Sequence, residues 1–421
     1  SPRRKRKVRL MLITNIQQLV NVRYSHSRLR GQELAHLPIL NQAYLRIEQG
    51  KIADFGSMQD LKGEKGDLDA TGRILLPTWC DSHTHTVFPA SREEEFLDKL
   101  RGLSYAEIAA KGGGILNSAA KLATIPEDEL FHGATQRIQQ MIRLGTGALE
   151  IKSGYGLSTA AELKMLRVIQ QLKAWAPIPI KATFLGAHAL PLNFKNDKEA
   201  YLREVMDVML PQIAEEGLAD YIDVFCETGF FSEADSLRIL QAGRRYGLKG
   251  KIHANQLNLS GGVQAGYAGR ALSVDHLETV SEEEISILGK ADAPMATLLP
   301  TAAYFLRMGF PPARKLLEAG ASLVLASDFN PGSSPSGNMN TVVSMACIQM
   351  RMLPEEAINA ATLNAAYAME VEEEVGSITV GKRANLLLTK PVPSLAYLPY
   401  SFGENCIDKV FINGTPSDDL F

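Results

Sequence analysis

The stretch "LLPTWCDSHTHT", residues 75–86, decides the fold prediction. An apolar run that starts at Ile74 leads into two histidines one residue apart, and the whole chain has only eight histidines. Alternate residues of a strand face the same side, so His83 and His85 point together toward one place. The pattern indicates a buried strand that ends at a functional site.

Further apolar runs of strand length follow at intervals along the chain. We predict eight strands, at residues 74–81, 147–152, 180–185, 221–226, 249–254, 272–276, 294–299 and 322–327. Amphipathic segments with helical spacing separate them, at residues 126–144, 159–174, 198–217, 232–246, 261–269, 281–289 and 311–319. Eight such units predict parallel strands with right-handed crossovers, and therefore an α/β fold with a closed, TIM-like (β/α)8 barrel.

The two ends of the chain read differently from its middle. Residues 8–70 and 376–414 hold short alternating segments joined by turns, such as "AYLRIEQGKIADFG" at 43–56. Neither end is long enough to build a good core alone, so we predict that both join in one small composite β domain. The predicted parts are residues 1–73 and 373–421 for this domain and 74–372 for the barrel, with helices at 337–352 and 354–369 before the second part.

The composition excludes several classes of protein. Of the 421 residues, 44 are basic and 47 acidic, which argues against a nucleic-acid partner. The four cysteines lie far apart, as expected of free thiols in a reducing compartment, and no apolar run approaches the length of a membrane span. We therefore expect a cytoplasmic protein without a membrane partner. We interpret the basic run Arg3 to Lys7 as a solvated chain end and not as a localisation signal.

Polar residues recur where the predicted strands end. His188 follows the third strand, His253 and His276 lie at the ends of the fifth and sixth, and Asp328 follows the eighth. Barrels of this type carry their catalytic groups at that rim. Each residue alone could be a hydrogen-bonded structural residue, but such explanations would have to coincide at one face. Three imidazoles and one carboxylate suit Zn²⁺ or iron, and not Ca²⁺ or Mg²⁺.

These motifs resemble the metal-dependent amidohydrolase superfamily. Within it, the chain is similar to the branch that opens the ring of 4-imidazolone-5-propanoate in histidine degradation. The matching stretches are "DSHTHTVFPASREEEF" (81–96), "AAKGGGI" (109–115), "EIKSGYGL" (150–157), "TFLGAHALP" (183–191), "DVFCETGFF" (223–231), "HANQL" (253–257), "SVDHLE" (273–278), "LLPTAAYFLR" (298–307), "ASDFNPGSSP" (326–335) and "NAAYAM" (364–369). Two positions depart from common patterns of the superfamily, Thr78 in place of a glycine and Asn255 in place of an acid.

The resemblance implies a site, a reaction and a cofactor. The implied metal ligands, for one Zn or Fe ion, are His83, His85, His253 and Asp328. The implied substrate-binding residues are Arg92, Tyr155, His188, Gln256, Asn330, Gly332 and Ser333. His276 and Asp328 are the candidates to move the proton of the attacking water, and the product would be N-formimidoyl-L-glutamate. Arg92 suits the propanoate of this small-molecule substrate. Members of the superfamily are often homodimers, so a second copy of the chain is a further partner that the resemblance allows.

Other interpretations remain open from the sequence. A deaminase of a nucleobase-like ring would usually place a glutamate where this chain has Gln256, whose amide cannot carry a proton. A hydantoinase-type enzyme would need a second metal ion, for which Lys152 and Glu227 are the nearest candidates. A non-catalytic scaffold would be expected to lack a ligand, and all four are present. Arg92 could also be a surface arginine paired with Glu93–Glu95 on the next helix.

Overall fold

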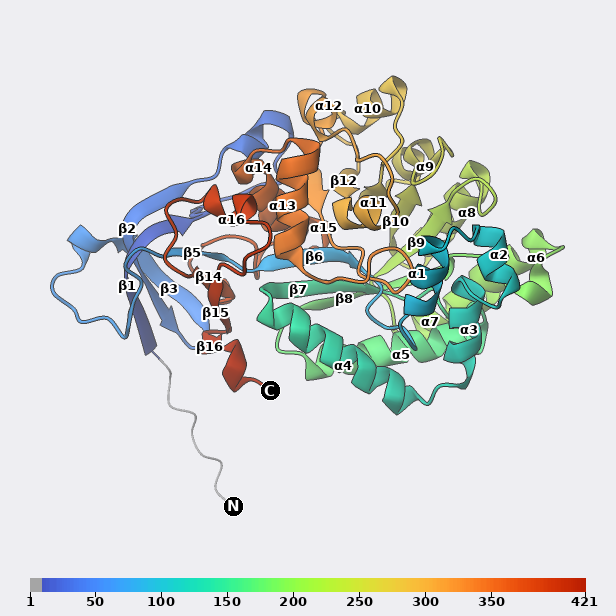
Figure 1. Ribbon diagram of the computed structural model, residues 1–421, viewed down its shortest axis with the longest axis horizontal. Coiled ribbons are helices and arrows are strands. Elements are labelled where there is room, and N and C mark those ends of the chain that lie inside the picture. Colours follow the sequence, from blue (N-terminus) through green and yellow to red (C-terminus); the bar gives the residue numbers. More distant parts are fainter. Residues whose placement is uncertain (1–9) are drawn as a thin grey trace, which may run out of the picture.

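The computed structural model describes residues 10–421, which form an eight-stranded barrel with helices around it and a second sheet at one end (Figure 1). The basic run Arg3 to Lys7, which we interpreted as a solvated chain end, lies outside the described residues. Blue N-terminal strands and red C-terminal strands lie together in the second sheet, so both ends of the described residues lie in the same layer.

The predicted barrel is confirmed. Its strands are β6 (Trp79–Thr84), β7 (Thr146–Lys152), β8 (Ile180–Ala187), β9 (Tyr221–Cys226), β10 (Lys249–Ala254), β11 (Ser273–His276), β12 (Met295–Leu298) and β13 (Leu323–Leu325). Each pairs in parallel with the next along the chain. A parallel bridge between Thr84 and Phe329 joins the first strand to the segment after the last. This closure brings the residues that follow β6 and β13 side by side.

Helices follow the strands on the outside of the barrel (Figure 1). They are α1 (Glu93–Leu100), α2 (Tyr105–Ala110), α3 (Ile115–Thr124), α4 (Glu127–Arg143), α5 (Thr159–Trp175), α6 (Lys198–Arg203), α7 (Leu210–Glu216), α8 (Glu233–Arg245), α9 (Gly262–Ala268), α10 (Glu282–Leu288), α11 (Pro300–Phe305), α12 (Ala313–Glu318), α13 (Met339–Met350), α14 (Pro354–Ala361) and α15 (Leu363–Ala368). A further helix, α16 (Tyr397–Tyr400), comes from the C-terminal part of the chain and contacts α13. Ser232 and Ser281 cap α8 and α10, each accepting a hydrogen bond from the backbone N–H three residues on. The caps explain why these helices begin directly after their loops.

Three predicted elements were wrong in detail. The predicted strand 74–81 is two strands, because β5 (Ile74–Pro77) pairs with the second sheet and β6 begins at Trp79. The chain changes sheets at Thr78, whose N–H donates to Asn385 O. The predicted helix 354–369 is broken into α14 and α15 at Thr362, which has φ −124° and ψ −89°. The predicted helix 198–217 contains a wider π-helical turn over Glu204–Met209, between α6 and α7.

The second sheet confirms the predicted composite of both chain ends. Its strands are β1 (Leu10–Val20), β2 (Ile39–Glu48), β3 (Lys51–Ser57), β4 (Leu68–Asp69), β5, β14 (Leu386–Thr389), β15 (Ile407–Ile412) and β16 (Thr415–Pro416). The hydrogen-bonded order is β16-β15-β14-β5-β1-β2-β3, with β4 beside β1. Its own apolar core includes Ile13, Ile16, Leu45, Leu386 and Phe411, all nearly inaccessible to solvent. Burial of that face stabilises the sheet although its strands come from both ends of the chain.

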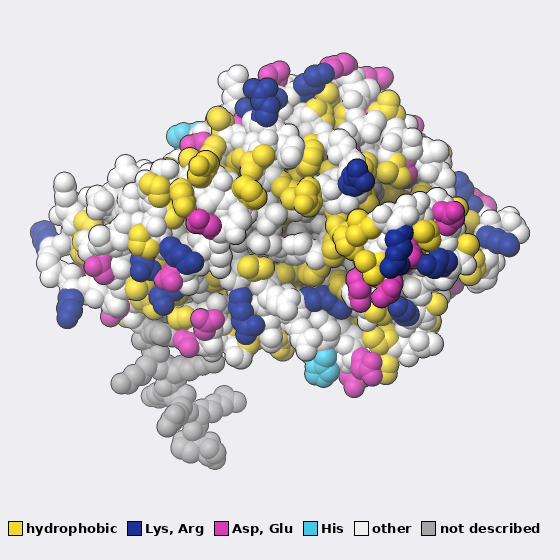
Figure 2. All heavy atoms as spheres, viewed as in Figure 1, with side chains coloured by type: hydrophobic (Ala, Val, Ile, Leu, Met, Phe, Trp, Pro, Cys, Tyr) yellow, Lys and Arg dark blue, Asp and Glu magenta, His cyan; other side chains and the backbone are white. Residues whose placement is uncertain are grey.

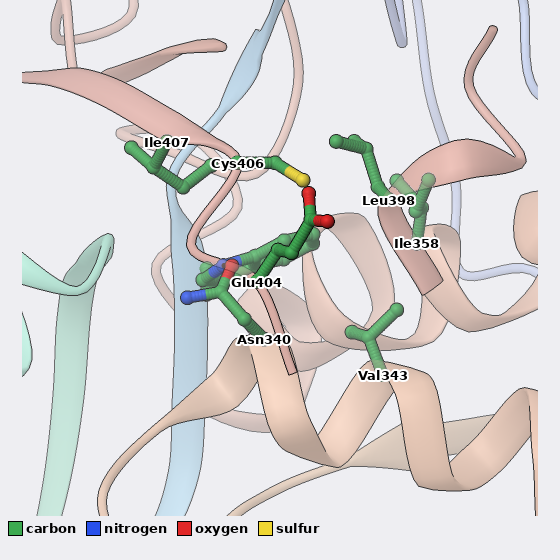
Figure 3. A pocket seen from close by; sticks show the side chains of 8 residues that line it. Asn340, Val343, Ile358, Leu398, Glu404, Cys406 and Ile407 are labelled. Atoms are coloured by element: carbon green, nitrogen blue, oxygen red, sulfur yellow. Dashed lines mark hydrogen bonds between the residues drawn. The ribbon is translucent and has the colours of Figure 1, made fainter. Parts of the chain in front are cut away.

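A small cavity lies where the second sheet, α13 and the start of β6 meet (Figure 3). Eight residues line it: Trp79, Asn340, Val343, Ile358, Leu398, Glu404, Cys406 and Ile407. Trp79 Nε1 donates to Asn340 Oδ1 across 2.9 Å, and Asn340 Nδ2 donates to Leu144 O. Trp79 begins β6, so this cavity lies at the opposite end of the strand from His83. It belongs to the packing between the two sheets.

The surface shows a few gathered apolar side chains. Figure 2 shows them over α13 and α16 and over α1. Exposed examples include Ile348 on α13, Tyr400 on α16 and Leu100 on α1. Cys80, Cys226, Cys347 and Cys406 are free thiols, as predicted. Within residues 10–421, no helix is long and apolar enough to cross a membrane.

Candidate metal centre

Four side chains meet at the C-terminal rim of the barrel. His83 is the penultimate residue of β6 and His85 follows the strand, His253 comes from β10, and Asp328 follows β13. The Nε2 atoms of His83 and His85 each lie 3.2 Å from Asp328 Oδ1. One ring nitrogen from each of the three histidines lies within 4.8 Å of the other two. All four residues are at most 3% exposed, so these polar groups converge in a space closed to solvent.

The arrangement fits a metal ion. His83 Nε2 is buried and has no hydrogen-bond partner, although Asp328 Oδ1 is near it. Leaving such a nitrogen unsatisfied costs about 1–3 kcal/mol, which coordination would remove. Two ligand atoms at ~2.1 Å from one ion, a tetrahedral angle apart, are separated by about 3.4 Å. The separations around Asp328 Oδ1 are close to that value, and three nitrogens with one oxygen make a suitable ligand set.

Two buried carboxylates orient the histidines. Asp275 Oδ2, on β11, lies 2.5 Å from His83 Nδ1, and Asp223 Oδ1, on β9, lies 3.0 Å from His253 Nδ1. Both carboxylates are inaccessible to solvent. Because Nδ1 of each ring faces a carboxylate, the Nε2 lone pair is the one directed into the cluster. Partners of this kind are typical of metal-binding histidines.

The cluster also sets the protonation of its members. Burial lowers the pKa of His253 to about 4, although Asp223 opposes it, so this ring is neutral. Burial also lowers the pKa of His85. For Asp328, burial would raise the pKa, but His83 and His85 hold it well below its usual value. Burial and Lys152 would lower the pKa of His83, and Asp275 and Asp328 raise it to about 9. A metal ion at His83 Nε2 would therefore displace a proton.

His276 lies on the other side of Asp328. Its Nε2 is 3.7 Å from Asp328 Oδ2, and its Nδ1 is 3.2 Å from Glu278 Oε1. The backbone of His276 has φ +94°, a strained value for a residue with a side chain. Burial would lower the pKa of this imidazole, but the Glu278 carboxylate raises it. The ring can therefore hold a proton beside the carboxylate of Asp328.

The loop after β7 brings Tyr155 to the same rim. The Tyr155 ring centroid lies 6.0 Å from that of His85 and 5.7 Å from that of His188. The rings of His188 and His85 stack at 5.7 Å, and His188 Nδ1 is 2.9 Å from Gly154 O. The buried carboxylate of Glu162 accepts hydrogen bonds from the N–H groups of Gly154, Gly156 and Leu157, each at 3.1 Å. Glu162 thus holds the loop that presents Tyr155.

The loop after β13 carries Asn330, Gly332 and Ser333. Asn330 Oδ1 accepts from the N–H groups of Gly332 and Ser333, each at 2.8 Å. Its Nδ2 donates to Asp328 O and Ser333 Oγ. The Asn330 amide therefore shapes the loop from inside. The Ser333 hydroxyl accepts the bond from Asn330, which leaves its own proton available.

Arg92 and Gln256 lie on loops around this rim. Arg92 immediately precedes α1 and donates from Nε and Nη2 to Glu95 Oε2, at 3.0 and 2.9 Å. Its guanidinium also packs on the loop after β13, since a Cβ built on Gly332 would lie 2.7 Å from Nη1. Arg92 therefore has the acidic partner expected of a surface arginine, and it also has the position at the rim expected of a substrate-binding residue. Gln256 is half-buried just after β10, two residues beyond Ala254.

The two candidates for a second metal ion are engaged elsewhere. Lys152 Nζ lies 2.6 Å from Glu150 Oε2 and 2.8 Å from Asp223 Oδ2. Burial would lower the pKa of this lysine, but Asp223 and Glu150 raise it, so the amine stays a charged ammonium. Glu227 accepts from Leu257 N and Asn258 Nδ2 and thereby holds the loop after β10. Both groups are used in the protein itself, and neither belongs to the metal-competent groups found among the described residues.

Five carboxylates around the rim were not predicted from the sequence as site residues. They are Glu95, Glu162, Asp223, Asp275 and Glu278. Asp275 and Glu278 could have been noticed, because they lie within two residues of His276 at the end of a predicted strand. Glu95, Glu162 and Asp223 have no local signal, since an acid in a strand or an early helical turn is common.

A parallel barrel with a buried histidine and aspartate cluster at its C-terminal rim defines a class, the metal-dependent barrel hydrolases. The model of the amidohydrolase family matches residues 74–416, and the chain belongs to that family. Within it, the chain belongs with the imidazolonepropionases. An imidazolonepropionase of Christiangramia forsetii is 54% identical over 96% of this chain and 99% of its own length. One of Alkaliphilus metalliredigens is 38% identical over 96% of this chain and 97% of its own.

Solved structures agree on the fold. A 5-methylcytosine deaminase from Klebsiella pneumoniae has a TM-score of 0.73 at 15% identity, covering 96% of this chain and 97% of its own. E. coli guanine deaminase has a TM-score of 0.72 at 15% identity, covering 97% and 98%. At such identities the likeness extends to the barrel and second sheet and says nothing about the substrate.

Proposed function

We propose that the chain hydrolyses the ring C–N bond of 4-imidazolone-5-propanoate and releases N-formimidoyl-L-glutamate. The observation that carries the proposal is similarity to curated imidazolonepropionases along nearly the whole chain, at 54% identity over 96% of it. The buried cluster of three histidines and Asp328 supplies a site suited to hydrolysis. The reaction adds water to the ring carbonyl carbon, breaks the adjacent C–N bond and leaves the new N–H on the departing nitrogen.

The proposed ligands are His83, His85, His253 and Asp328, for one ion of zinc or iron. Two carboxylates in hydrogen-bonding distance of ring nitrogens and one imidazole nitrogen without a partner support this set. When bound, such an ion supplies Lewis acidity for the ring carbonyl and for the attacking water. The ligand chemistry suits either metal, and both are proposed.

The proposed proton path runs through Asp328 and His276. Their nearest atoms lie 3.7 Å apart, and both are buried. Asp328 is held ionised, so its free oxygen can accept the proton of the water. His276 is held in place by Glu278 and can give a proton to the departing ring nitrogen.

The proposed substrate contacts surround this pair. Arg92 would bind the propanoate through a charge-assisted hydrogen bond. The Tyr155 hydroxyl and the His188 ring would contact the imidazolone, and both already lie against His85. Gln256 would hydrogen-bond the ring without carrying a proton. The loop of Asn330, Gly332 and Ser333 would close the remaining side, with the Ser333 hydroxyl as its donor.

The sequence also predicts properties of the protein other than its reaction. The family implies a small-molecule substrate. A homodimer, the absence of a nucleic-acid partner, a cytoplasmic location and the domain division at residues 73/74 and 372/373 stay predictions.

The test is a hydrolysis assay with metal analysis. Purified protein is expected to consume 4-imidazolone-5-propanoate, to yield N-formimidoyl-L-glutamate and to carry about one metal ion per chain. Chelation should abolish turnover, and readdition of zinc or iron should restore it. Two ions per chain would favour a hydantoinase-type enzyme. Absence of turnover by metal-loaded protein would refute the proposal.

A further inference from the structure

Glu95 contacts two separate parts of the chain at the rim of the barrel. Its Oε2 accepts from Nε and Nη2 of Arg92, and its Oε1 accepts from the backbone N–H of Gly114 at 2.5 Å. The side chains of Arg92 and Glu95 are only 12% and 10% exposed. One nearly buried carboxylate thus joins the arginine before α1 to the first residue before α3.

The glycine run Gly112 to Gly114 is shaped for this contact. A Cβ built on Gly113 would lie 2.7 Å from Ile108 Cγ2 and 3.1 Å from Glu95 Oε1, so a side chain there would push the run away from Glu95. Gly114 has φ +87°, a conformation that favours glycine. The triplet lets the backbone approach the carboxylate closely.

The bonds to Glu95 also decide which edge of Arg92 is free. Nε and Nη2 are taken, and among the described residues no hydrogen bond is found for Nη1. Nη1 lies over Gly332, on the loop that carries Asp328. Lys99, one helical turn beyond Glu95, donates to Gly332 O at 3.3 Å. The guanidinium is therefore held between α1 and the loop after β13 with one donor edge unused.

We propose that Glu95 is a positioning residue for substrate specificity: it holds Arg92 so that the free Nη1 edge receives the propanoate, and it ties the glycine run 112–114 to that arginine. The inference rests on the proposed function, because it takes Arg92 as the group that binds the carboxylate. An arginine already held in one rotamer loses less conformational freedom on binding an anion than a mobile one. Without Glu95, Arg92 should remain present but bind the substrate carboxylate more weakly.

The experiment measures kcat and KM for the acid substrate and for an analogue whose propanoate is a neutral amide. Glu95→Gln is compared with Glu94→Gln, a loss of charge on the same helix at an exposed residue. Glutamine has one oxygen, so it can accept from Arg92 or from Gly114, but not both as Glu95 does. We expect Glu95→Gln to raise KM for the acid about tenfold with kcat within twofold, and to leave the amide unchanged. Glu95→Asp, with its charge on a shorter arm, should fall between.

Two further readouts separate positioning from general folding. The double variant Arg92→Ala with Glu95→Gln should be no worse on the acid than Arg92→Ala alone. Trypsin should cut metal-loaded Glu95→Gln faster at Arg101 and Lys111, which flank α2 and are 66% and 57% exposed, than it cuts Glu94→Gln. Equal metal content in all variants shows that the metal site is intact.

The outcomes distinguish a failure of this inference from a failure of the proposed function on which it rests. If Arg92→Ala selectively impairs the acid while Glu95→Gln behaves like Glu94→Gln, the inference falls and the proposed function stands. If Glu95→Gln impairs acid and amide alike, or lowers kcat alone, Glu95 supports structure and does not position Arg92. If Glu95→Gln does not fold, an unchanged acid-to-amide ratio in Glu95→Asp with unchanged trypsin cleavage overturns the inference. If the wild-type protein does not turn over the acid, the proposed function itself falls.

Discussion

Lys152 Nζ lies 2.8 Å from Asp223 Oδ2, and the other oxygen of that carboxylate lies 3.0 Å from His253 Nδ1. Lys152 also contacts Glu150, and all three charged groups are inaccessible to solvent. Lys251 reaches the same Glu150 oxygen at 3.0 Å and donates to Ser82 O. The orientation of His253, a candidate metal ligand on β10, therefore depends on a lysine three strands away on β7.

Replacing Lys152 by methionine should destabilise the protein strongly. The change leaves Asp223 and Glu150 buried without their shared cation, and breaking a buried pair in this way costs about 3–5 kcal/mol. The matched control is Lys173→Met, whose partner Asp220 lies 2.6 Å away with both side chains 30% exposed. A pair so exposed is worth about 0–1 kcal/mol. Denaturant unfolding of both variants makes the comparison, and equal losses would contradict the role given to Lys152.

Replacing His253 by alanine should remove most of the bound metal. The variant loses one of three ring nitrogens that lie within 4.8 Å of one another, and the barrel has other contacts to keep it folded. His132→Ala, on the exposed side of α4, is the control. Metal per chain, circular dichroism and turnover are measured. Full metal content with normal turnover in His253→Ala would refute the ligand assignment.

Because of Lys382, we expect the free energy of unfolding of the protein to depend on pH. Lys382 is 3% exposed and donates to Val375 O and Ser377 Oγ, and burial lowers its pKa to about 8 from 10.5. Between these values the unfolded chain binds more protons, so this residue makes the protein more stable as pH rises from 8 to 10.5. The free energy of unfolding of wild type minus that of Lys382→Met should rise by about 3 kcal/mol between pH 7 and pH 10.5. A difference that stays constant with pH would contradict this.

The barrel could be predicted because its signals are local. Each inner strand is a short apolar run, and polar groups such as His253 and Asp328 mark where strands end. The change of sheet at Thr78 is missed although Pro77 stands directly before it, because residues 74–81 otherwise form one largely apolar run. Thr78 also fills the space over Gly147, where a Cβ would lie 2.0 Å from its Oγ1. Which sheet a strand joins is decided by such packing between distant segments.

Some residues of the candidate site could likewise be predicted from the sequence, and others could not. Residues that face the cluster from strand ends, such as His83 and His276, have a readable position in the strand period. Asp223, which contacts His253, and Glu95, which contacts Arg92, have no such signal, because they differ from ordinary surface acids only in being buried against a partner. In the segment between His85 and residue 126, a helix is predicted only at Glu93–Glu95, where α1 begins, and α2 and α3 are not predicted. Its helices are short, and its glycines suggest a loop.

Gln256→Glu tests the kind of reaction at the site. The amide of Gln256 can donate and accept hydrogen bonds but cannot carry a proton, whereas deaminases of this fold need a proton carrier at such a place. We expect the variant to lose imidazolone hydrolysis more than it gains deamination. Activity of wild type and variant toward cytosine and guanine is measured beside activity toward 4-imidazolone-5-propanoate. Turnover of either base by the unmodified protein would contradict the proposed reaction.

Arg92→Ala tests the substrate. A charge-assisted hydrogen bond to a carboxylate is worth about 1.5–3 kcal/mol, or about 10–150-fold in affinity. The variant should lose roughly this factor in kcat/KM for 4-imidazolone-5-propanoate and far less for an analogue with a neutral amide in place of the propanoate. Arg92→Lys should recover only part of the loss, because a point charge cannot both pair with Glu95 and present a second donor edge. If Arg92→Ala impaired acid and amide equally, the arginine would serve to hold α1 against the loop at Gly332, and the carboxylate would have to be bound elsewhere.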